Sequence, residues 1–103
     1  MSQKQDKVFE FYKVLASIEN AEEIKLLLED LCTYKELEYF NQRLNSAIML
    51  LKGATYQQVS ETVDNISTAT LSRVSKCIKH GSGGYSVVLK KYIENQNEGE
   101  ENA

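Results

Sequence analysis

The 103-residue chain contains no proline, no tryptophan and only five glycines, four of which lie at or after position 81. Since proline and glycine interrupt helices most strongly, their scarcity favours helices joined by short turns. The two cysteines, Cys32 and Cys77, can form at most one disulfide, which excludes the disulfide-rich scaffold of small secreted domains, and we expect free thiols. No apolar run approaches the roughly 20 residues of a membrane helix, and residues 1–7 lack the apolar stretch of a secretory signal. We therefore expect an all-α, cytoplasmic protein with no membrane partner.

Acidic side chains are missing from residues 65–93, which carry five basic ones, although the net charge of the whole chain is −3. The basic residues are Arg73, Lys76, Lys79, Lys90 and Lys91. Such a block can face phosphates, whereas an acidic chain is not expected to coat nucleic acid indiscriminately. The alternative is a solvated helix face whose acidic counterparts lie elsewhere in the sequence.

Three helices are predicted before Gly53 from the spacing of apolar residues. The first covers residues 3–17, the second opens with Asn20 and Glu23 as a capping box, and the third opens with a similar pair, Thr33 and Glu36. The third ends at Gly53, and its residues 47–51 spread apolar side chains around more than one face. That helix is therefore central to the fold or lies at a subunit interface.

Two short helices and a tight turn are predicted after Gly53. Thr55 with Gln58 caps the first helix, and Ser67 caps the second. On the second helix Leu71, Val74 and Ile78 face inward, and the residues expected to face outward are Thr68, Ser72, Ser75, Lys76 and Lys79, flanked by Ala69 and Arg73. The glycine-rich segment 81–84 is expected to act as a hinge before a last helix at about 85–95.

A short helix, a tight turn and a second helix with a small, polar and basic face are the parts of a DNA-binding helix-turn-helix. Hydroxyls bond bases or phosphates, small residues admit the backbone to the major groove, and lysine or arginine neutralises phosphates. The candidate DNA-binding residues are Gln57, Gln58, Ser67, Thr68, Ala69, Thr70, Ser72, Arg73, Lys76 and Lys79. The alternatives are a polar-faced helix in an ordinary bundle and, for the two glutamines, simple solvation.

Residues 31–81 resemble the Trp repressor superfamily, most closely its YerC/YecD branch. Four features carry the resemblance, namely Arg43, the Leu-Leu-Lys-Gly run at 50–53, the Tyr-Gln-Gln run at 56–58, and the run Ile-Ser-Thr-Ala-Thr-Leu-Ser-Arg at 66–73. The resemblance implies about six helices with a helix-turn-helix, arranged as an intertwined homodimer that binds double-stranded DNA. The sequence departs from the family pattern at Gln58 and Glu61, where basic residues are usual. The resemblance therefore implies weaker attraction of phosphates at these two positions.

The family's tryptophan pocket carries over only in part. Thr33, Arg43 and Arg73 stand where the resemblance implies corepressor contacts, although ion pairing of both arginines with acidic neighbours is the alternative. Val74 stands where a glycine makes room for the indole, and Cys77 stands where a serine bonds the ligand's amino group. Tryptophan is therefore not expected to be the effector, and the effector is left unassigned.

Enzymatic and metal-binding patterns are not found. Cys77 and His80 stand one helical turn apart, but one cysteine and one histidine do not make a four-ligand zinc site. We expect no enzyme activity, no metal and no cofactor.

The predicted plan is one helical domain over residues 1–95, with dimerisation helices at 1–53, the helix-turn-helix at 55–80 and a final helix at 84–95, followed by a frayed acidic tail at 96–103. The predicted function is sequence-specific transcriptional regulation, and the alternative is a helical protein-interaction module without operator binding.

Overall fold

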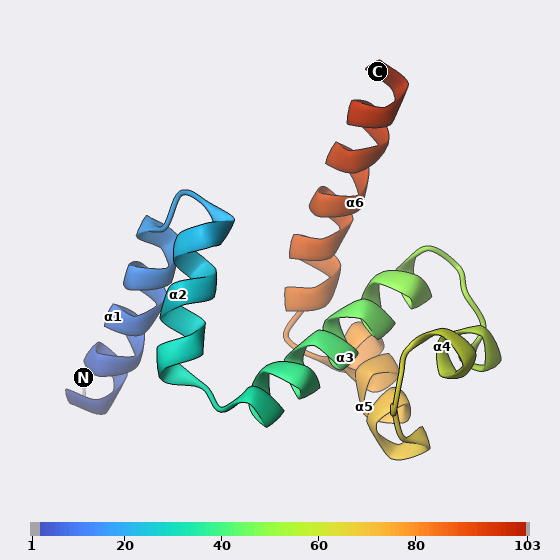
Figure 1. The fold of residues 1–103 in the computed structure, drawn as a ribbon, viewed down its shortest axis with the longest axis horizontal. Helices are drawn as coiled ribbons and strands as arrows, with labels where there is room; N and C mark the ends of the chain where they lie inside the picture. The colour runs from blue at the N-terminus through green and yellow to red at the C-terminus, as the bar shows by residue number, and fades with distance from the viewer. Residues whose placement is uncertain (1–2, 103) are drawn as a thin grey trace. The chain divides into compact units, whose positions relative to one another are not determined.

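The computed structural model describes the backbone of residues 3–102 and the side chains of residues 8–97. Six helices make up this part of the chain (Figure 1), and their bounds are α1 Gln3–Ser17, α2 Ala21–Leu31, α3 Tyr34–Leu51, α4 Tyr56–Thr62, α5 Thr68–His80 and α6 Gly84–Asn102. Residues 3–102 contain no strand, so the all-α prediction is confirmed. Among the same residues, no helix combines the length and apolar character needed to cross a membrane.

The helix starts follow the capping residues. The Thr33 hydroxyl accepts the N–H of Glu36 at 3.1 Å, while the Glu36 carboxylate accepts the N–H of Thr33 at 2.8 Å. Thr55 and Gln58 form the same reciprocal box at 3.1 and 2.8 Å. Asn20 accepts the N–H of Glu23 at 2.9 Å, but the Glu23 carboxylate bonds the Asn20 side-chain amide rather than its backbone. Three-residue spacing therefore identifies each of these starts correctly.

The chain divides into two compact units, Met1–Leu37 and Glu38–Ala103. The first holds α1, α2 and the first turn of α3, and none of its side chains between residues 8 and 37 is buried. Large apolar side chains on these helices are exposed instead, among them Phe9 at 58% and Leu26 at 59%. The apolar faces of α1 and α2 therefore lack a buried core of their own within residues 8–37, and the single helical domain expected over residues 1–95 stays a prediction.

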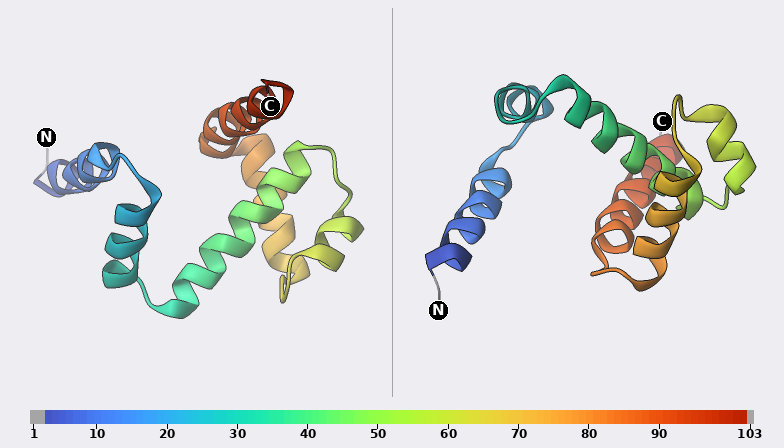
Figure 2. Two further views of the ribbon diagram at one scale, coloured as in Figure 1. Left: turned by 45° about the horizontal axis from the view of Figure 1, so that its top comes forward. Right: turned by 90° about the horizontal axis from the view of Figure 1, so that it is seen from below.

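The second unit is built around the C-terminal half of α3, as Figures 1 and 2 show. Ala47 packs with Val74 of α5 and Leu89 of α6 in one buried cluster. Val59 in the middle of α4 and Val63 just after its end pack with Leu71 of α5 in a second cluster. Apolar side chains of residues 48–51 contact one or both clusters, which explains why that segment is apolar on more than one face. Of the two positions left open for this helix, central to the fold or at a subunit interface, residues 47–51 occupy the central one within this unit.

Two boundaries depend on backbone details. Gly53 ends α3 with φ +97°, and the N–H groups of Gly53 and Ala54 bond the carbonyls of Leu50 and Met49, each at 3.0 Å. At the other end of the chain, α6 continues to Asn102 instead of ending near Asn95. The tail expected to fray at 96–103 is helical through Asn102, since glutamate and glutamine are good helix formers and Gly99 alone costs only about 1 kcal/mol.

Candidate nucleic-acid interface

Helix α5 is fixed on one face by the core and exposed on the other. Leu71 and Val74 are each 2% exposed. Leu71 anchors α5 against α4, and Val74 anchors it against α3 and α6. The exposed side chains are those of Thr68, Ala69, Ser72, Arg73, Lys76, Lys79 and His80, while Thr70 is half-buried. The helix therefore presents small polar residues in its first turns and basic residues further along.

Ser75 was expected on this exposed face, and that prediction is wrong. Its exposure is only 7%, because it follows Leu71 by four residues and so lies on the same side of the helix. The exposed surface is therefore narrower than predicted. The basic residues on this surface are Arg73, Lys76 and Lys79, and Ser75 is buried behind them.

The turn between α4 and α5 has a defined backbone. Asn65 adopts the left-handed region with φ +62°, which asparagine tolerates better than most residues. Two residues later, the Ser67 hydroxyl accepts the N–H of Thr70 at 3.0 Å and starts α5. Val59 and Val63 on one side of this turn pack against Leu71 on the other, so the angle between the two helices is set by buried contacts.

Several candidate DNA contacts already have partners. The Gln58 side-chain oxygen accepts the N–H of Thr55 at 2.8 Å, and the Gln57 amide donates to Glu61 at 3.1 Å. The Ser67 hydroxyl donates to the Thr70 hydroxyl at 2.9 Å. Both glutamines and Ser67 remain exposed, so part of their hydrogen-bonding capacity still faces solvent.

The residues predicted to line an effector pocket differ in burial and position, and the pocket stays a prediction. Val74 is buried with Ala47 and Leu89, so its side chain fills core volume rather than lining an opening. Arg73 is exposed on α5. Arg43 is half-buried, and its Nε is buried without a hydrogen-bond partner. Thr33 belongs to the first unit, where it caps α3.

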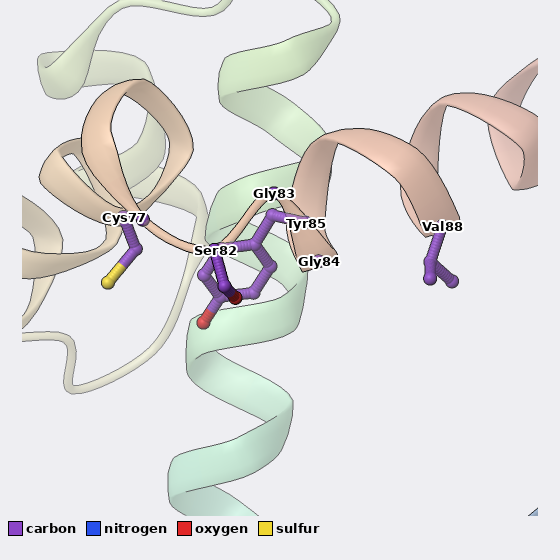
Figure 3. Close-up of a pocket in the computed structure, with 7 residues that line it drawn as sticks. Cys77, Ser82, Gly83, Gly84, Tyr85 and Val88 are labelled. Carbon is purple, nitrogen blue, oxygen red and sulfur yellow. The ribbon is translucent and has the colours of Figure 1, made fainter.

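A pocket of about 410 Å³ lies at the turn from α5 to α6 (Figure 3). Its lining consists of Cys77, Gly81, Ser82, Gly83, Gly84, Tyr85 and Val88. Cys77 is thus shared between the predicted effector set and this pocket. The glycine-rich segment expected to act as a hinge supplies four of the seven lining residues. The sequence does not predict the pocket itself, because its walls also include Cys77 of α5 and Val88 of α6.

Three comparisons relate this architecture to known proteins. A family model described as Trp repressor protein matches residues 6–93. A Bacillus subtilis (strain 168) protein named uncharacterized protein YerC is 36% identical over 89 residues, which cover 86% of this chain and 85% of that protein. A crystal structure from Staphylococcus aureus, described as a candidate Trp repressor, matches with a TM-score of 0.79 and 30% identity over 89% of this chain and 95% of its own.

These matches include both α4 and α5 and confirm the resemblance seen in residues 31–81. They also extend it in both directions, to the N-terminal helices and to about the first half of α6. The chain belongs to the Trp repressor family.

Proposed function

We propose that the protein is a cytoplasmic, sequence-specific DNA-binding transcriptional regulator that acts as a homodimer. In this proposal α4 and α5 form the helix-turn-helix, and α5 enters the major groove. The observation that carries it is the exposed face of α5 in a member of the Trp repressor family, where small polar residues precede Arg73, Lys76 and Lys79. Residues 65–93 carry no acidic side chain that would repel phosphates from this face.

The homodimer gives exposed apolar side chains of both units a partner. Phe40 and Leu44 on α3 are 50% and 45% exposed, and they stand one helical turn apart. Together with the exposed side chains of α1 and α2, they supply apolar area of the kind that marks an interaction surface. A second copy of the chain presents the same surface, as the isologous interface of a two-fold dimer requires.

Two copies of α5 related by two-fold symmetry are expected to occupy successive major grooves of a roughly palindromic site, with half-sites about 10 base pairs apart. The remaining candidate contacts, Gln57, Gln58, Ser67 and Thr70, lie at the edge of the groove, where their remaining hydrogen-bonding capacity serves phosphates. Tryptophan is not proposed as the effector, because Val74 occupies core volume where an indole would need space.

Selection of bound fragments from random duplex DNA tests this function. The dimer should enrich one motif with two-fold symmetry, and affinity for that motif should fall steeply as salt rises, since bound phosphates release counterions. A folded dimer that enriches no motif at low salt would exclude the regulator function.

The alternative function is a helical protein-interaction module that keeps the fold without binding an operator. The observation that favours it is Glu61, an exposed acidic residue on α4 whose carboxylate bonds Gln57, one of the candidate DNA contacts. This module should show no DNA affinity above background at low salt. Its partner binding should also survive substitution of Thr68 and Ser72.

A further inference from the structure

We infer that α5 recognises thymine through methyl contacts made by Thr68 and Ala69. This inference rests on the proposed DNA-binding function and names the chemical group that the helix reads. Thymine carries the C5-methyl group in the major groove, an apolar feature that the other three bases lack, and small apolar groups such as those of alanine and threonine contact it.

The glutamines of α4 are poorly placed to supply the base readout. Two hydrogen bonds to one adenine require both the oxygen and the amide nitrogen of a glutamine side chain. The Gln58 oxygen instead holds the start of α4 by accepting the Thr55 N–H at 2.8 Å. The Gln57 amide donates to Glu61 at 3.1 Å, beside a carboxylate that also repels phosphate. Bidentate reading by either residue would break a bond that the fold uses.

The hydroxyls at the start of α5 are committed in a similar way. Ser67 accepts the N–H of Thr70 at 3.0 Å and donates to the Thr70 hydroxyl at 2.9 Å. Moving Ser67 to bond a base would expose the first turn of α5 to fraying, because the cap would be lost. Thr70 itself is half-buried beside Leu71.

The exposed groups that remain in the first turn are those of Thr68 and Ala69. Ala69 offers only a methyl group, and Thr68 offers a methyl group beside its hydroxyl. Arg73, Lys76 and Lys79 begin further along the helix and supply the charge that holds the duplex. The leading end of α5 is thus chemically matched to an apolar, methyl-bearing base edge.

The DNA side of the test uses the selected motif with each thymine replaced singly by deoxyuridine. This change removes the C5-methyl group and leaves base pairing and the O4 acceptor intact. We expect at least one thymine in each half-site at which deoxyuridine weakens binding about four-fold, the effect of leaving one methyl group unburied. Thymines outside the half-sites are the matched control and should tolerate deoxyuridine.

The protein side uses Thr68→Ser, which removes the methyl group and keeps the hydroxyl, and Thr68→Val, which keeps a methyl group and removes the hydroxyl. Thr68→Ser should shrink the difference between thymine and deoxyuridine toward one-fold, whereas Thr68→Val should preserve it. Ala69→Gly should act like Thr68→Ser at its own thymine. Thermal unfolding of each variant identifies any affinity loss that comes from the helix rather than from the contact.

The outcomes separate this inference from the function on which it rests. If no motif is enriched by folded protein, the regulator function and the thymine readout both fail. If a motif is enriched and deoxyuridine is tolerated at every thymine, the function stands and the methyl readout is wrong. The readout is equally wrong if the discrimination survives both Thr68→Ser and Ala69→Gly.

Discussion

Lys76 and Lys79 occupy exposed positions on α5 beyond its small first turn. In the proposed complex each neutralises one phosphate, so replacing either with alanine should weaken binding to all sequences by similar factors. The slope of log affinity against log salt should fall by about one unit for each lysine removed. Lys25→Ala, which removes an exposed lysine from α2, is the control. An unchanged salt slope in Lys76→Ala and Lys79→Ala would remove both residues from the phosphate contacts.

The position of Val74 is the reason that we expect no tryptophan binding. Its side chain packs with Ala47 and Leu89 at 2% exposure, which leaves no space for an indole at that position. Calorimetry should detect no tryptophan binding at sub-millimolar concentration, and DNA binding should not require it. Val74→Gly combined with Cys77→Ser opens the site, at a cost of about 1 kcal/mol for glycine in a helix and about 1.5–3 kcal/mol for the lost burial of Val74. A micromolar dissociation constant for the unmodified protein would contradict this expectation.

Glu36 gives the start of α3 a pH dependence. The Thr33 N–H, and secondly the Thr33 hydroxyl, bond its carboxylate and lower the pKa of Glu36 below its ordinary value. Because this pKa is lower in the folded chain than in the unfolded one, the stabilisation is present above the unfolded pKa and is lost as pH falls through the folded pKa.

An NMR titration of the Glu36 carboxyl, folded and in urea, should show the lower pKa in the folded chain. Glu36→Gln is the matched variant, since its side-chain oxygen can still accept the Thr33 N–H but does not titrate. The variant should therefore lose this part of the acid dependence of unfolding. Equal Glu36 pKa values in the two states would contradict the capping explanation.

The junction of α4 with α5 depends on Asn65, whose φ of +62° is unfavourable for residues with branched side chains. Asn65→Val should lower the free energy of unfolding by about 1–2 kcal/mol. Asn65→Gly should be tolerated, because glycine adopts positive φ freely. Chemical denaturation of the two variants measures the difference. If both variants have equal stability, the left-handed turn is not required in solution.

Glycine is needed for different reasons at the junction before α4 and at the junction after α5. Gly53 supplies positive φ at the end of α3, whereas Gly81 is needed for space at the end of α5. A Cβ atom added at Gly81 would lie 2.5 Å from the carbonyl oxygen of Cys77. The start of the turn toward α6 is therefore shaped by a close backbone approach rather than by conformational freedom.

The proposed homodimer predicts that side chains exposed in a single chain are buried in the assembly. Leu44 is 45% exposed here, yet Leu44→Ala should destabilise the dimer by about 2–5 kcal/mol, the range for a fully buried leucine. Asn45→Ala, at the exposed neighbouring position on α3, is the control and should have little effect. The melting temperature of the unmodified protein should rise with concentration.

Sedimentation at micromolar concentration provides the independent measurement. A stably folded monomer, together with a Leu44→Ala variant of unchanged stability, would contradict the dimer. The exposed apolar side chains of α1 and α2 would then need a different partner.

Local chemistry made much of this fold predictable. Thr33 with Glu36, Thr55 with Gln58, and Ser67 with Thr70 are bonded across three residues, so the starts of α3, α4 and α5 can be read without tertiary information. The basic composition of residues 65–93 and the motif at 66–73 also point to α5 and to the family before any coordinates are considered.

Packing between residues distant in sequence decided the rest. Ser75 is buried, Val74 joins Ala47 and Leu89, and the pocket beside Cys77 opens where α5 turns into α6. The division of the chain after Leu37 is likewise visible only in the folded backbone. A capping bond is settled by residues a single turn apart, whereas burial depends on surfaces that folding brings together, so only the tertiary structure determines which side chains remain free for a ligand.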